Sequence, residues 1–123
     1  MTKTHSRAEI GALGEGLAVE HLRGLGLQIV ERNWRCRYGE LDVVAADEAA
    51  RVLVFVEVKT RTTEQFGGAL AAVTPTKLRR LRRLAGLWLA AHDGSWEQVR
   101  IDVVAVTLGR TRTPELTHLQ GVG

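Results

Sequence analysis

Two acidic residues and a lysine occupy two apolar segments that lie close together in the sequence. Asp42 belongs to the segment 39–46, and Glu57 and Lys59 belong to the segment 52–59. A short polar connection between alternating or apolar runs predicts a β-hairpin. Folding this hairpin about the middle of the connection places Glu57 opposite Asp42. Two carboxylates on one face would then have Cβ atoms about 4.5–5.5 Å apart.

Two carboxylates in an apolar hairpin are costly unless a cation or a proton is supplied. Lys59 follows Glu57 by two positions and is therefore expected on the same face. The carboxylates of Asp42 and Glu57, with a main-chain carbonyl, are hard oxygen ligands suited to Mg²⁺ or Mn²⁺. The alternative is a buried Glu57–Lys59 ion pair, with Asp42 bonded to the backbone. The metal site depends on the register of the hairpin, because a slip of one residue would put the two acids on opposite faces.

The elements that position these residues follow from the apolar periodicity. A helix is expected over 7–25, a strand over 27–35, the hairpin, a loop over 62–68, a helix over 75–91, a strand over 99–106 and a short edge strand over 115–119. A tight connection makes the hairpin antiparallel, and a helical crossover makes the third and fourth strands parallel. The sequence therefore predicts an α/β fold with a mixed central sheet flanked by helices.

The ends of both helices carry recognisable signals. Thr74 and Pro75 suit the N-cap and first position of the second helix. In the first helix, glycines at 11, 14 and 16 interrupt the pattern and indicate close backbone packing or approach by a ligand. The expected apolar stripe of that helix contains Ile10, Leu13, Leu17, Ala18, Leu22 and Leu25.

Composition limits the class of protein. A chain of 123 residues, 45% hydrophobic and 25% charged, suits one globular domain, with a core over about 7–108 and peripheral ends over 1–6 and 109–123. No apolar run approaches the roughly 20 residues of a membrane span. The first seven residues lack the apolar core of a secretory signal, so a cytoplasmic protein is expected. Cys36 is the only cysteine, which excludes an internal disulfide and a cysteine-based zinc site.

Basic residues gather in two places, although the net charge is only +3. One group lies on the second helix, and the other runs from the first strand into the connection before the hairpin: Lys77, Arg79, Arg80, Arg82, Arg83, and Arg32, Arg35, Arg37. Such clusters suit a polyanion such as nucleic acid, and a solvated helix face is the alternative. Trp34 and Tyr38 alternate with arginines, a mixture that suits base stacking or, equally, an aromatic packing face.

Several of these residues together resemble the YraN family of small bacterial proteins. The resemblance runs from about Gly11 to Val106 and is carried by Glu15, Gly39-Glu40-Leu41-Asp42, the segment from Phe55 to Arg61, Lys77 and Arg100-Ile101-Asp102-Val103. That family is similar to the PD-(D/E)xK nucleases of the Holliday junction resolvase and restriction-endonuclease-like type. The resemblance implies an αβββαβ core. Leu41 stands where the name of the superfamily has proline.

The resemblance also implies roles for individual residues. Asp42, Glu57 and the Val58 carbonyl would hold Mg²⁺ or Mn²⁺, Glu15 would contribute through water or a second ion, and Lys59 would orient or deprotonate the nucleophile. The expected contacts to nucleic acid are Lys77, Arg79, Arg80, Arg83, Arg35, Arg37 and Arg61. The implied partner is branched or double-stranded DNA, with a homodimer for symmetric cutting of a junction. Two alternatives stay open at this stage: a non-catalytic nucleic-acid-binding module of the same fold, and a protein-interaction adaptor.

Overall fold

The structure, a computed structural model, describes residues 6–62, 71, 73–109 and 113–123. Its elements, in chain order, are α1 (Arg7–Gly24), β1 (Gln28–Cys36), β2 (Gly39–Asp47), β3 (Val52–Arg61), α2 (Pro75–Ala91), β4 (Gln98–Thr107) and β5 (Glu115–Leu119). The predicted order of helices and strands is confirmed. Of the predicted loop at 62–68, all but residue 62 lies outside the described residues.

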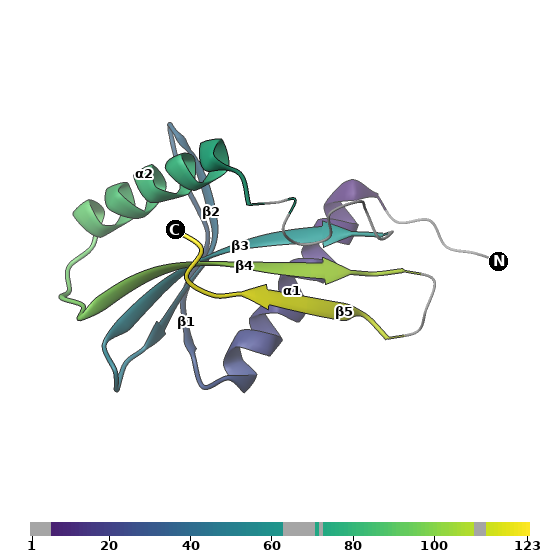
Figure 1. Ribbon diagram of the computed structural model, residues 1–123, viewed down its shortest axis with the longest axis horizontal. Helices are drawn as coiled ribbons and strands as arrows, with labels where there is room; N and C mark the ends of the chain where they lie inside the picture. The colour runs from purple at the N-terminus through teal and green to yellow at the C-terminus, as the bar shows by residue number, and fades with distance from the viewer. Residues whose placement is uncertain (1–5, 63–70, 72, 110–112) are drawn as a thin grey trace.

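The strands form one sheet in the order β1-β2-β3-β4-β5. The β3–β4 pair is parallel, as the helical crossover predicts, and the other three pairs are antiparallel. Helix α1 covers one face of this sheet and α2 covers the other (Figure 1). The predicted α/β fold with a mixed sheet between helices is therefore confirmed, and it is compatible with a restriction-endonuclease-like core.

The hairpin strands are buried on both faces because their side chains alternate between the two helices. Val44 and Phe55 face each other in the β2–β3 ladder and pack under α2, whereas Val43 and Val56 pack under α1. Leu53 pairs with Ala46 and Phe55 with Val44, as folding the hairpin about the middle of its connection places them. Burial of both faces explains why these strands are almost continuously apolar.

The apolar stripe predicted for α1 is partly wrong. The buried residues of the helix are Gly14, Ala18, Val19 and Leu22. Leu13 is 48% exposed and Leu25, the C-cap, is 53% exposed. The helix approaches the sheet through Gly14, and the residues four and eight positions later follow on the same face. Val19 is buried on one side of that line, whereas Leu13 lies on the other side of the helix and faces solvent.

Helix α2 begins and packs as its sequence predicts. The Thr74 hydroxyl caps the helix by accepting a hydrogen bond from the Lys77 N–H, at 3.1 Å. Its buried residues are Leu81, Leu84, Ala85 and Trp88, which recur at helical spacing and form one apolar face. No helix among the described residues is long and apolar enough to cross a membrane.

Candidate active site

The candidate site forms where strands β2 and β3 separate. The ladder between them runs from Asp47↔Val52 to Val43↔Val56. Before Val43, β2 pairs with β1, and after Val56, β3 stays paired with β4 as far as Arg61. Asp42 and Glu57 are the next residues after the last pair, so the expected register brings them to the point of divergence. A separation of two strands in mid-sheet opens room for side chains and for a ligand.

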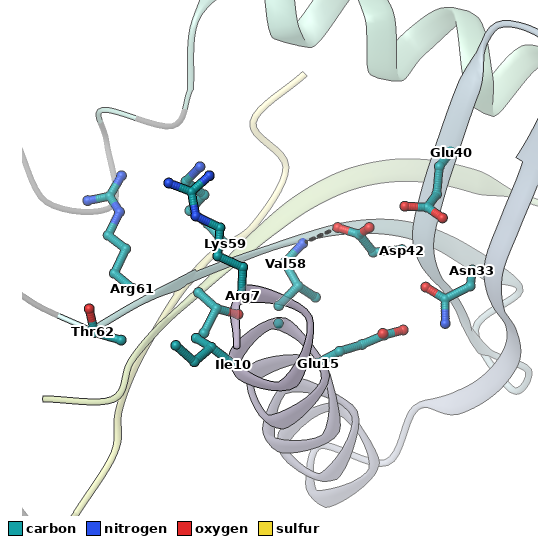
Figure 2. A pocket seen from close by; sticks show the side chains of 12 residues that line it. Arg7, Ile10, Glu15, Asn33, Glu40, Asp42, Val58, Lys59, Arg61 and Thr62 are labelled. Carbon is teal, nitrogen blue, oxygen red and sulfur yellow. Dashed lines mark hydrogen bonds between the residues drawn. The ribbon is translucent and has the colours of Figure 1, made fainter. Parts of the chain in front are cut away.

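A break in the alternation of β2 turns Asp42 toward this opening. Strict alternation would place Leu41 with Val43 under α1, but Leu41 packs with Val44 under α2. The break falls between these positions and aims the Asp42 carboxylate sideways, at β3. Its Oδ2 accepts a hydrogen bond of 2.8 Å from the Val58 N–H (Figure 2). The carboxylate thereby pairs with a backbone N–H that would have bonded to the β2 backbone if the β2–β3 ladder had continued.

The surroundings of Asp42 raise the pKa of its carboxyl group from 3.8 to about 6. Burial is the largest cause, because it disfavours the charged form. The hydrogen bond from Val58 acts in the opposite direction, and the negative charges of Glu57, Glu40 and Glu15 raise the pKa further. Three further acidic groups therefore lie near Asp42 and favour its protonated form.

A pocket of about 700 Å³ surrounds Asp42. Its lining comes from α1, from the start of β2, from the end of β3 and from β1: Arg7, Ile10, Gly11, Glu15, Asn33, Glu40, Asp42, Val58, Lys59, Thr60, Arg61 and Thr62. Figure 2 shows the acids Glu15, Glu40 and Asp42 toward one side and the Lys59 and Arg61 side chains toward the other. One part of the pocket suits a cation, and the other suits an anion.

Close packing of α1 against β3 delivers Glu15 to this pocket. A Cβ on Gly14 would stand 2.6 Å from Thr60 Cγ2 and closer still to Thr60 Oγ1. Only glycine permits this approach, so the packing predicted for the helix glycines is found at Gly14, whereas Gly11 and Gly16 face open space. Glu15 is 15% exposed and lies 3.5 Å from the Arg32 guanidinium.

Glu57 points toward α2 and is not among the side chains that line the pocket. Its Oε2 lies 2.6 Å from Lys77 Nζ and 3.9 Å from Arg80 Nη2. The expected alternative of a Glu57–Lys59 ion pair is therefore replaced by a pair with the helix, while Asp42 does bond to the backbone. Lys59 lines the pocket instead.

The oxygen atoms at the divergence suit a hard divalent ion. Asp42 and Glu57 lie close enough for the charge of Glu57 to raise the pKa of Asp42. In an extended strand the N–H and C=O of one residue point toward the same neighbour, so the Val58 carbonyl is directed to the side on which Asp42 receives the Val58 N–H. Among the described residues no three His, Cys, Asp or Glu side chains are grouped as a ready-made cage. Two carboxylates and one carbonyl match Mg²⁺, which keeps several waters.

The arginines predicted to bind nucleic acid have different surroundings. Arg35 pairs with Glu40 at 2.7 Å, and Arg61 lines the pocket. On α2, Arg79 donates to the Thr76 hydroxyl and Arg80 reaches Glu57. The guanidinium groups of Arg37 and Arg83 lie 5.3 and 3.9 Å from the centre of the exposed Tyr38 ring. Trp34, by contrast, packs against the core under α2.

Sequence reasoning missed two pocket residues and one buried network. Arg7 and Asn33 line the pocket, and neither carries a motif. Asn33 has a φ of 54°, a backbone conformation that asparagine tolerates better than most residues. Its residue type is therefore compatible with this irregular position in β1, but no motif marks it.

The network centres on Asp102, which is fully buried and accepts two hydrogen bonds from Arg100, at 2.9 and 3.0 Å. Arg100 and Asp102 therefore form an ion pair with two hydrogen bonds within β4. His118 also bonds Asp102, at 2.7 Å, and contacts His21 at 3.0 Å. Burial and the neighbouring His118 lower the pKa of His21. These contacts tie α1, β4 and β5 together across 97 residues of sequence.

Comparison with known proteins gives a consistent picture. Residues 14–106 match the model of a family described as Uncharacterised protein family UPF0102. A UPF0102 protein of Mycolicibacterium gilvum is 67% identical over 123 residues, which is the whole of both chains. One of Mycolicibacterium vanbaalenii is 69% identical over 122 residues, 99% of each chain. One of Mycobacterium marinum is 64% identical over 121 residues, 98% of this chain and 99% of the relative.

Proposed function

The chain belongs to the UPF0102 family, the YraN family that its motifs predict, and we propose that it is a metal-dependent endonuclease that hydrolyses phosphodiester bonds in DNA. The observation that carries the proposal is the convergence of Asp42, Glu57 and the Val58 main chain where β2 and β3 separate, beside a pocket lined by Lys59. Burial, with a smaller contribution from the neighbouring acids, raises the pKa of Asp42 to about 6 there, and a bound cation would favour its charged form. Phosphodiester hydrolysis requires a cation and a positioned nucleophile at one place.

Each residue of the site has a distinct task under this proposal. Asp42, Glu57 and the Val58 carbonyl would hold Mg²⁺ or Mn²⁺, and Glu15 would add its carboxylate from α1 through water or a second ion. The ion would supply a water of lowered pKa and charge stabilisation at the scissile phosphate. Lys59 orients or deprotonates the attacking water from the anion-binding part of the pocket. Lys59 follows Glu57 by two positions on a strand that β4 holds in register, so the backbone position of Lys59 is fixed relative to Glu57.

The substrate follows from the charge around the pocket. Arg61 stands at its edge, and Lys77, Arg79, Arg80, Arg83, Arg35 and Arg37 provide the surrounding positive charge that would hold a phosphate backbone. Such contacts are sequence-tolerant and weaken with salt. We propose branched or double-stranded DNA in the bacterial cytoplasm as the substrate, with a two-fold dimer if four-way junctions are cut symmetrically.

One observation favours a second candidate, a non-catalytic nucleic-acid-binding module. The Glu57 carboxylate is already neutralised by Lys77, at 2.6 Å. If that ion pair were permanent, Glu57 would serve the packing of α2 on the sheet and would bind no metal. The basic surface would then still bind nucleic acid, with no cutting.

A panel of linear, flapped and four-way-junction DNAs, incubated with protein and Mg²⁺ or Mn²⁺, distinguishes the two candidates. The wild type should cut at least one substrate, and Asp42→Asn and Lys59→Met should lose the cutting. The matched controls are Asp93→Asn and Arg23→Met, which remove the same charges from exposed positions. Salt-sensitive binding without cutting across the whole panel would favour the non-catalytic module.

A further inference from the structure

Lys77 holds the place at Glu57 that a bound ion would need. Its Nζ lies 2.6 Å from Glu57 Oε2, and the more distant Arg80 approaches the same oxygen. The Glu57 side chain is only 10% exposed, so water provides little of its neutralisation. Lys77 is therefore the main counter-charge of this carboxylate in the metal-free protein.

Among the residues that the structure describes, no cation is paired with Asp42. Its hydrogen-bond partner is a neutral backbone N–H, and the groups that shift its pKa, apart from burial and this bond, are acids. Of the two adjacent carboxylates, one is neutralised by α2 and the other is not. In the metal-free site, therefore, only the charge of Glu57 is balanced, and the balancing side chain, Lys77, lies on α2.

From this asymmetry we infer that Lys77 is a positioning residue that competes with the metal for Glu57 and couples metal binding to DNA binding. The inference rests on the proposed function. An ammonium group and a divalent cation repel each other at one carboxylate oxygen, so metal binding displaces Lys77 from Oε2. The released ammonium stays at the first turn of α2, which Thr74 caps, and becomes free to bind a phosphate.

Coupling follows from this exchange. DNA that binds the Lys77 ammonium lowers the cost of removing it from Glu57, so DNA strengthens metal binding. By reciprocity, metal strengthens DNA binding by the same factor. Without Lys77 the metal binds more tightly on its own, and the effect of DNA on metal binding is lost. A purely structural ion pair predicts the opposite, because its loss would disorder Glu57 and weaken metal binding.

The test measures Mn²⁺ binding, by calorimetry and by electron paramagnetic resonance of free Mn²⁺, with and without a short DNA duplex. Lys59→Met is present in every sample to prevent cutting. Lys77→Met should bind Mn²⁺ about tenfold more tightly than the parent in the absence of DNA. The duplex should tighten Mn²⁺ binding of the parent about tenfold and that of Lys77→Met by less than twofold. Arg23→Met, which removes an exposed charge from α1, should behave like the parent.

If Lys77→Met fails to fold, Lys77→Gln provides a second neutral variant, whose amide can still donate a hydrogen bond to Glu57. Equal or weaker Mn²⁺ binding in the folded Lys77 variants would overturn the coupling and leave the proposed nuclease site intact. Absence of Mn²⁺ binding in the parent and in all variants would overturn both the coupling and the proposed metal site.

Discussion

Replacing Asp42 with asparagine is expected to stabilise the metal-free protein at neutral pH. Burial and the charges of Glu57, Glu40 and Glu15 raise the pKa of Asp42 from 3.8 to about 6. The folded state therefore holds this proton more tightly than the unfolded state does. Stability from this group is fully present below pH 3.8 and is lost as the pH rises through about 6. Asparagine carries no charge to lose, and its side-chain oxygen still accepts the Val58 N–H.

The magnitude follows from the difference between the two pKa values. A gap from 3.8 to about 6, at about 1.4 kcal/mol per pH unit, corresponds to about 3 kcal/mol. Because the pocket is open to water, which screens charges, we expect about 1.5–3 kcal/mol. The free energy of unfolding of Asp42→Asn should exceed that of the wild type by this amount above about pH 7. The difference should vanish near pH 4.

Urea unfolding at several pH values in a chelator measures this difference. Asp93→Asn is the matched control, since Asp93 is exposed and its substitution should have no pH-dependent effect. Carboxyl carbon NMR of the wild type should report a pKa of about 6 for Asp42 directly. An asparagine variant no more stable than wild type at pH 7.5, or a difference that does not change with pH, would refute the account of charge at the site.

Three further substitutions test other parts of the structure. Gly14→Ala should destabilise the protein by about 2–4 kcal/mol in urea unfolding, because its Cβ would overlap Thr60, whereas Gly11→Ala on the same helix faces open space and should be neutral or stabilising by up to about 1 kcal/mol; equal effects would contradict the packing. Lys77→Met should cost about 2 kcal/mol in thermal or urea unfolding, and addition of Glu57→Gln should restore most of it, because the buried carboxylate is then no longer left unpaired. Asp102→Asn should cost about 3 kcal/mol by the same measurement, since Arg100 would lose its buried partner, and a loss below about 0.5 kcal/mol would show that the network is unimportant.

The fold was predictable where local chemistry decides it. Thr74 and Pro75 fix the start of α2, and Leu81, Leu84 and Trp88 recur at helical spacing on its buried face. The hairpin register was predictable because both strands are apolar and the turn between them is short. The buried face of α1 was less predictable. The helix approaches the sheet most closely at Gly14, and a glycine has no side chain that would contribute to an apolar pattern.

The candidate site was predictable in its residues but not in their orientation. The hairpin register brings Asp42 and Glu57 to one point, but periodicity does not show that β2 and β3 separate after Val43↔Val56. Where the strands separate, Asp42 accepts a hydrogen bond from Val58, and Glu57 forms an ion pair with Lys77 of α2, 20 residues later in the sequence. Contacts between distant elements, such as His21 with His118, have no local signal at all.

The most direct test of the central claim is single-turnover cutting of a labelled DNA in Mn²⁺ by wild type, Lys59→Met and Asp42→Asn. The account predicts cutting by the wild type that a chelator abolishes, and a loss of at least about a hundredfold in each variant, typical of removing a proton-transfer or charge-stabilising group. It also predicts that both variants still bind the DNA, with the salt dependence of the wild type or nearly so. Cutting that persists undiminished in Asp42→Asn would show that the activity does not arise at this site. Complete absence of cutting in the wild type, with tight DNA binding, would contradict the nuclease assignment.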